Sequence, residues 1–244
     1  MMYITAYPLT QRSKTMDRII RAVAAAALTA GLLAVGCGKK TAPATHSPTT
    51  DENGIESVAP ITDAVSATAT GTFTDTRDGQ TYKTVKIGKQ TWMARNLNYQ
   101  TESGSWCYDN NADNCKQYGR LYDWETAKTV CHKGWKLPDT ADWNRLVASA
   151  GGEDIAGKKL KSKSGWKENG NGTDIYGFSA LPSGHRYSGG DFDDAGNNGN
   201  WWAATEHSGG FAYYRFMGYD IDLVYEYYYV KNFGSSVRCV ADNP

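Results

Sequence analysis

Four cysteines constrain most strongly how the last two thirds of this chain can fold: Cys107, Cys115, Cys131 and Cys239. They follow a segment with the features of an export signal, and cysteines of exported proteins are expected to pair. Four cysteines allow three pairings, and the sequence alone does not choose among them. The first two flank the turn-rich loop CYDNNADNC, which favours a local bridge and leaves Cys131 to pair with Cys239. This second bridge would close a long loop and stabilise the fold by on the order of 4 kcal/mol in the chain-entropy model.

The export signal lies in the stretch MDRIIRAVAAAALTAGLLAV. Arg18 and Arg21 form a basic front, and residues 22–35 form an uncharged, mostly apolar core. That core is shorter than the ~20 residues that a membrane-spanning helix needs. We therefore interpret residues 1–36 as a signal peptide. Met16 is an alternative start, because the residues before it carry no signal features.

The first cysteine of the chain, Cys37, stands where the apolar core ends and a polar stretch begins. The letters AVGC that end at Cys37 resemble the bacterial lipobox, whose cysteine is acylated and becomes the mature N-terminus. The alternative is an ordinary signal peptide with an incidental cysteine. We expect residues 37–70, rich in Thr, Ala, Ser and Pro, to be a lipid-anchored flexible linker. The protein would then lie outside the cytoplasm in the bacterial cell envelope, anchored to the outer membrane.

Residues 71–244 carry every tryptophan of the chain and are long enough for one domain. Without residues 1–36 the chain has 22 basic and 25 acidic residues. This balance leaves no electrostatic footprint for nucleic acid, so we expect no nucleic-acid partner. The chain contains 16 tyrosines and 8 tryptophans, which can pack a core or supply a binding surface.

The first half of this domain is predicted to contain one β-hairpin followed by helices. Two β-prone runs flank Gly88-Lys89, which predicts a type II′ hairpin turn. Apolar residues at helical spacing predict a helix over residues 121–131. A second helix follows Asp139, which can cap it together with Asp142, and Gly151 can end it. A short helix is expected over residues 154–161.

Strands are predicted in the second half, where turns separate short aromatic runs: YGFSAL, NWWAAT, FAYYRF and SSVRCV. Helices followed by strands indicate an α+β domain, with two main helices and short antiparallel strands.

Several motifs of residues 71–242 resemble, in order, those of the Fibrobacter succinogenes major paralogous domain family. They are TYKTVKIGKQTWMARNLNY, CYDNNADNCKQYGRLYDWETA, GWKLPDTADWNRL, AGKKLKSKSGW, DIYGFSALPSGHR and SSVRCV. The resemblance implies a secreted bacterial domain whose biochemical role is largely undetermined.

Two of these motifs, GWKLPDTADWNRL and SSVRCV, are also distantly similar to formylglycine-generating-enzyme domains and their C-type-lectin-like relatives. That similarity implies a C-type-lectin-like fold, in which an early helix is linked by a disulfide to the last strand. Cys131 and Cys239 occupy the matching places, which supports the long-range bridge by analogy.

An enzyme on this scaffold is the alternative function. Formylglycine-generating enzymes use a pair of late cysteines, whereas the late half of this chain has only Cys239. His132, His185 and His207 lie in separate segments without the spacing of metal ligands. The acidic residues of SGGDFDDAGNNGN and Glu206 could form a pair for glycoside hydrolysis, but we expect them to lie in a solvated loop.

Two oxygen-rich loops and the cysteines are the candidate metal ligands of this chain. Asp109, Asn111 and Asp113 have the spacing that begins an EF-hand loop, but Arg120 stands where the bidentate Glu is required. Zinc is disfavoured because no CxxC pair exists. We therefore expect no cofactor, with one calcium ion at Asp191 and Asp193 as the alternative.

Aromatic runs in the last quarter suggest a non-catalytic binding surface for a carbohydrate or a cell-surface protein. The expected ligand-binding residues are Tyr187, Trp201 and Tyr214, with Asp191 and Asp193 as polar neighbours. Because adjacent residues of a strand face opposite sides, we expect Trp201 to face outward and its neighbour Trp202 inward. A third alternative is a structural or display lipoprotein without a small-molecule site.

Overall fold

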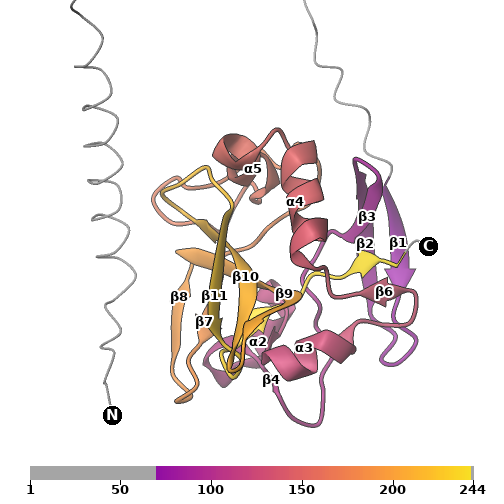
Figure 1. Cartoon of the computed structure of the whole chain (residues 1–244), viewed down its shortest axis with the longest axis vertical. Coiled ribbons are helices and arrows are strands. Elements are labelled where there is room, and N and C mark those ends of the chain that lie inside the picture. The colour runs from indigo at the N-terminus through magenta and orange to yellow at the C-terminus, as the bar shows by residue number, and fades with distance from the viewer. Residues whose placement is uncertain (1–69, 243–244) are drawn as a thin grey trace, which may run out of the picture. The chain divides into compact units, whose positions relative to one another are not determined.

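The computed structural model of this chain describes residues 70–242 (Figure 1). The expected signal peptide over 1–36, the acylation site Cys37 and nearly all of the expected linker over 37–70 lie outside the described residues. Within residues 70–242 the chain is an α+β domain, as the sequence predicts, with four α-helices and two main sheets. None of the helices in this part of the chain is long and apolar enough to cross a membrane.

Five strands form the smaller sheet, in the order β1-β2-β3-β13-β6. Their bounds are Thr70–Thr74, Thr81–Ile87, Gln90–Met93, Val240–Ala241 and Trp135–Lys136. The predicted hairpin is confirmed: β2 pairs with β3, and Gly88 has the positive φ of 60° that a type II′ turn requires. Because β13 pairs with β3 and β6, the C-terminal end of the domain closes onto its beginning (Figure 1).

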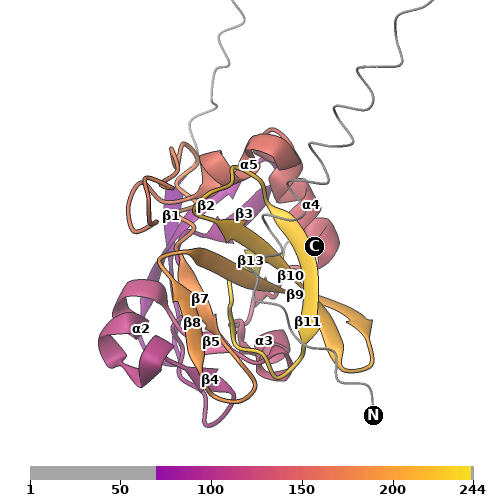
Figure 2. The ribbon, with the colours of Figure 1, turned by 90° about the vertical axis from the view of Figure 1, so that its left-hand side faces the viewer.

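The larger sheet has the order β11-β10-β9-β12-β5-β4. The bounds of these strands are Tyr225–Val230, Phe211–Gly218, Asn198–Ser208, Ser235–Ser236, Leu121–Tyr122 and Ser105–Trp106. A hairpin of β7 (Ser183–Arg186) and β8 (Phe192–Ala195) joins it, because β7 pairs with β9. Figure 2 shows β9, β10 and β11 side by side. Most pairs are antiparallel, as expected, but β7 and β12 run parallel to β9.

Two of the expected strands differ from the structure. The run SSVRCV is split between β12 in the larger sheet and β13 in the smaller one, so residues 237–239 connect the two sheets. The run YGFSAL forms no strand; it makes only an isolated parallel bridge between Ala180 and Lys161. In both places the tertiary neighbours, rather than the β-prone composition, determine the pairing.

The expected helices are present, and one more exists. α4 (Thr140–Ser149) begins with the predicted capping box of Asp139 and Asp142, and Gly151 follows it with φ 104°. α5 (Glu153–Leu160) matches the expected short helix. α3 (Trp124–Val130) starts later than predicted, because the two residues before Asp123 pair as strand β5 and Asp123 itself caps the helix.

The additional helix begins in the loop after Cys107 and contains Cys115. A 3-10 turn, η1 (Tyr108–Asn110), leads into α2 (Ala112–Tyr118). The side chain of Asn111 caps α2 by accepting a hydrogen bond from the backbone N–H of Asp113. The turn-rich composition that predicts a loop here reflects this capping instead.

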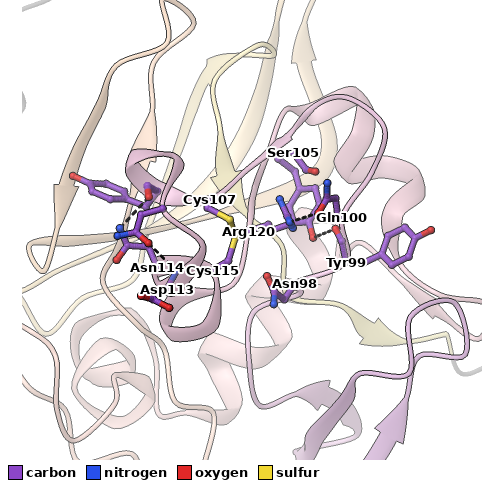
Figure 3. The surroundings of a disulfide bond; sticks show 12 residues. Asn98, Tyr99, Gln100, Ser105, Cys107, Asp113, Asn114, Cys115 and Arg120 are labelled. Atoms are coloured by element: carbon purple, nitrogen blue, oxygen red, sulfur yellow. Dashed lines mark hydrogen bonds between the residues drawn. A yellow bond between two sulfur atoms is a disulfide. The ribbon is translucent and has the colours of Figure 1, made fainter.

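Both expected disulfides form. Cys107 is bonded to Cys115, and Cys131 at the end of α3 is bonded to Cys239 just before β13. The first bridge spans 8 residues and the second 108. Figure 3 shows the short bridge, with Asn114 donating a hydrogen bond to the backbone oxygen of Tyr108 at 2.9 Å.

Strand β9 is covered on both faces over residues 199–203, which corrects the expected orientation of its tryptophans. Trp201 packs in one hydrophobic cluster with Trp143 of α4, and Trp202 packs in the other with Phe233. Neither side chain is exposed. The expectation that Trp201 faces outward is therefore wrong, because a strand buried on both faces has no solvent side to offer.

Arg238 links β3 of the smaller sheet to two neighbouring loops from inside the core. Its side chain is fully buried and donates hydrogen bonds to Asn96 Oδ1 and to the backbone oxygens of Met93, Phe178 and Ser179. Burial lowers the pKa of Arg238 to about 9. The hydrogen bonds offset the cost of removing this guanidinium from water.

Candidate functional site

The structure separates the residues expected to bind a ligand. Trp201 and Tyr214 are buried, and burial raises the pKa of the Tyr214 hydroxyl, so neither presents a surface to a ligand. Tyr187 is half-buried, and its ring meets the edge of Phe233 at 6.1 Å. Asp191 and Asp193 are exposed at the β7–β8 hairpin. Of the expected set, only this hairpin keeps residues accessible.

An exposed aromatic cluster lies elsewhere, around the end of the β9–β10 hairpin. We call it the aromatic tip, and it consists of His207, Phe211, Tyr213 and Tyr228. Tyr228 is at its centre: its ring stacks on His207 with 3.8 Å between centroids and 10° between planes. Phe211 and Tyr213 meet the edge of the same ring at 6.1 and 6.3 Å. Four rings from three strands therefore form one continuous surface.

Strand register places these rings on one face. Tyr213 of β10 is directly opposite Tyr228 of β11, and both lie on the face that carries Arg215 and Trp201. α4 covers that face around Arg215, whose guanidinium donates to the Asn144 side chain at 2.7 Å. The aromatic tip lies beyond this contact. As a result Tyr228 is 52% exposed and Phe211 40% exposed, whereas Trp201 on the same face is fully buried.

A sequence pattern points to the aromatic tip, although none of the expected ligand-binding residues belongs to it. Gly209-Gly210 separates two β-prone runs and predicts a hairpin, at whose end aromatic side chains stay uncovered. The run YEYYYV alternates across the sheet, so Tyr228 faces the opposite side from its two tyrosine neighbours. Which face of the sheet is covered depends on the position of α4, and that position does not follow from the sequence.

A second accessible group surrounds the β7–β8 hairpin. Arg186 of β7 lies against the Trp106 ring, with 4.2 Å between its guanidinium carbon and the ring centroid. The centroid of the Phe192 ring is 5.9 Å from the same carbon, and Tyr108 packs against Phe192 with 5.4 Å between ring centroids. We call these four residues the Arg186 cluster. All four are half-exposed.

The buried His185 lies on the opposite face of this hairpin. Burial lowers its pKa, which favours the neutral imidazole at neutral pH. Its Nδ1 is 3.9 Å from Asp194 Oδ2, and its Nε2 has no hydrogen-bond partner among the described residues. Phe233 and Tyr187 pack against the ring at 4.7 and 4.6 Å.

The oxygen-rich loops are occupied by internal contacts. Asn111 caps α2 and Asp113 pairs with Lys116 at 2.8 Å, so these two side chains stabilise a helix. Within residues 70–242, no group of three or more His, Cys, Asp and Glu side chains could hold a metal ion. The calcium alternative at Asp191 and Asp193 gains no support from these residues. Cys239 is part of a disulfide and offers no thiol.

Comparison with known proteins identifies the family. A model described as the Fibrobacter succinogenes major domain matches residues 85–241, more than half of the chain. The chain belongs to this family. The matched part of the Fibrobacter succinogenes major domain contains all four paired cysteines, the aromatic tip and the Arg186 cluster. No curated protein and no solved structure matches the chain.

Proposed function

We propose that this Fibrobacter succinogenes major domain is a non-catalytic binding module that recognises carbohydrate at the bacterial cell envelope through the aromatic tip. The observation that carries the proposal is the exposure of Tyr228 and Phe211 within a cluster of four rings, in a domain that buries its tryptophans at 92, 124, 143, 166, 201 and 202. Flat aromatic faces stack on the apolar faces of sugar rings, and tyrosine and histidine donate hydrogen bonds to hydroxyl groups.

The same proposal includes export and a C-type-lectin-like architecture. The bridge from the end of α3 to the residue before β13 supports the lectin-like comparison. Two disulfides support an oxidising compartment. The rigid sheet presents its hairpin ends as binding positions, which is where binding residues concentrate on such scaffolds.

Tyr228→Ala should weaken glycan binding by ~1–3 kcal/mol, because Tyr228 contacts all three other rings of the tip. A glycan-array screen of the full chain identifies the ligand, and titrations with that glycan measure the loss. Ile175→Ala is the matched control, since Ile175 is also a large exposed apolar side chain, at 39% exposed, outside the tip. Equal binding by the Tyr228 and Ile175 variants would reject the tip as the site. Binding of no glycan would favour a protein ligand or a display role.

Cys37→Ser should abolish acylation and release the protein from membranes, because the lipobox cysteine is the acyl acceptor in this proposal. Metabolic labelling with a fatty-acid analogue, followed by membrane fractionation, measures both effects. The matched control is Thr41→Ala, which changes a residue near Cys37 in the sequence without removing the acyl acceptor and should leave the label in place. A Cys37 variant that labels as strongly as the unaltered protein would exclude the anchor.

A further inference from the structure

Arg186, at the end of β7, is a half-exposed cation without an acidic partner. Among residues 70–242 no Asp or Glu oxygen lies within ion-pair distance of its guanidinium, whereas Arg77 pairs with Asp75 and Arg215 pairs with Glu226. The only hydrogen bond from its guanidinium to the described residues runs from Nη1 to the backbone oxygen of Tyr187, at 3.3 Å. Most of its donors are therefore available to a ligand.

Two aromatic rings lie beside this guanidinium. Its carbon lies over the Trp106 ring, 4.2 Å from the centroid, and is 5.9 Å from the centroid of the Phe192 ring. Stacking occupies the faces of a guanidinium and leaves its N–H donors at the edges, in one plane. A planar set of donors held in place matches the two oxygens of a carboxylate.

The hairpin keeps acidic side chains away from this edge. Register pairs Arg186 with Phe192 and His185 with Asp193, so Asp193 lies on the opposite face of the hairpin. Gly190 lies near Nη2 of Arg186, and it has φ 110° and no side chain. A Cβ added at Gly190 would be 3.4 Å from Nη2. The approach to the guanidinium edge is bordered by this glycine-containing turn.

The short disulfide holds the other half of the cluster. Trp106 and Tyr108 flank Cys107, which is bonded to the buried Cys115 of α2 (Figure 3). Tyr108 packs on Phe192 at 5.4 Å, so the bridged segment and the β7–β8 hairpin support each other. The rings and the cation are thereby positioned before any ligand arrives, which lowers the entropic cost of binding.

We propose that the Arg186 cluster is a second binding site that takes a uronic acid, a sugar that carries a carboxylate. Arg186 binds the carboxylate with two N–H donors, and the Phe192 and Tyr108 rings stack on the sugar. The choice of a sugar rests on the proposed function, whereas the choice of a carboxylate rests on the free donors of Arg186. The site is distinct from the aromatic tip, since none of its residues belongs to β9, β10 or β11.

Native gels that contain polygalacturonate test the site with the purified full chain. The unaltered protein should be retarded, and Arg186→Ala should raise the dissociation constant by about tenfold or more, as the loss of a charge-assisted pair of hydrogen bonds predicts. Arg186→Lys should also weaken binding, because it keeps the charge but loses the planar pair of donors. Lys163→Ala is the matched control: it removes one charge from an exposed residue and should bind normally.

Three outcomes would overturn the proposal. The first is the absence of retardation of the unaltered protein, and the second is an equal loss in the Lys163 and Arg186 variants, which would indicate non-specific charge attraction. The third is displacement by inorganic phosphate as effective as displacement by galacturonate, which would indicate an anion site without sugar recognition. Tyr228→Ala separates the two sites, since it should weaken glycan binding at the aromatic tip and leave retardation by polygalacturonate unchanged.

Discussion

Trp201→Ala is expected to lower the free energy of unfolding by ~3–5 kcal/mol, because it empties a site in a fully packed core. The Trp201 ring is fully buried, and its centroid lies 6.5 Å from the centroid of the Trp143 ring. Its Nε1–H donates a hydrogen bond to Asn96 Oδ1 at 2.9 Å. Asn96 Oδ1 still accepts from Arg238 in the variant, so the loss comes mainly from the cavity. For a domain of this size the melting temperature should fall by about 6–20 °C.

Thermal melts and urea unfolding of three variants test this expectation. Trp202→Ala should be destabilised to a similar degree, because Trp202 is equally buried on the opposite face and donates to the Tyr122 backbone oxygen at 2.8 Å. Tyr228→Ala is the aromatic control and should cost less than about 1 kcal/mol, since its side chain is 52% exposed. A Trp201 variant as stable as the Tyr228 control would contradict the two-sided burial of β9.

Removal of the Cys131–Cys239 bridge is the second large effect. In the chain-entropy model a closed loop of about 100 residues contributes about 4.7 kcal/mol, and this bridge spans 108 residues. The double variant Cys131→Ala with Cys239→Ala should lose stability of that order. The same bridge joins α3 to the connection between the two sheets, so its loss also loosens the C-terminal end of the domain.

The short bridge supplies a matched comparison. Cys107→Ala with Cys115→Ala removes a bridge that spans 8 residues, for which the same model gives about 2.5 kcal/mol. Guanidinium unfolding of both double variants, monitored by tryptophan fluorescence, compares the two losses directly. A larger loss from the short bridge would show that local strain or packing, rather than loop length, determines the contribution of each disulfide.

The features that depend on local chemistry could be predicted from the sequence. The α4 capping box needs only Asp139 and Asp142 three residues apart, and the β2–β3 turn needs only a glycine at position 88. The cap and the turn are specified within a few residues, so no knowledge of packing is required. The disulfide pairing was not specified in this way, because four cysteines allow three pairings; the spacing of Cys107 and Cys115 and the distant lectin-like similarity favoured the one that the structure has.

The binding surface depended on tertiary structure alone. Alternation along β9 correctly separates Trp201 from Trp202, but it cannot show that helices and loops cover both faces of that strand. The exposed rings instead belong to Tyr228 and its neighbours, where α4 no longer covers the sheet. Arg186 likewise became a candidate only when the fold placed it near Trp106 and Phe192, which belong to separate strands. The sequence determines which residues are aromatic or charged and which local turns and caps they form; long-range packing decides which of them meet water, because burial depends on neighbours distant in the chain.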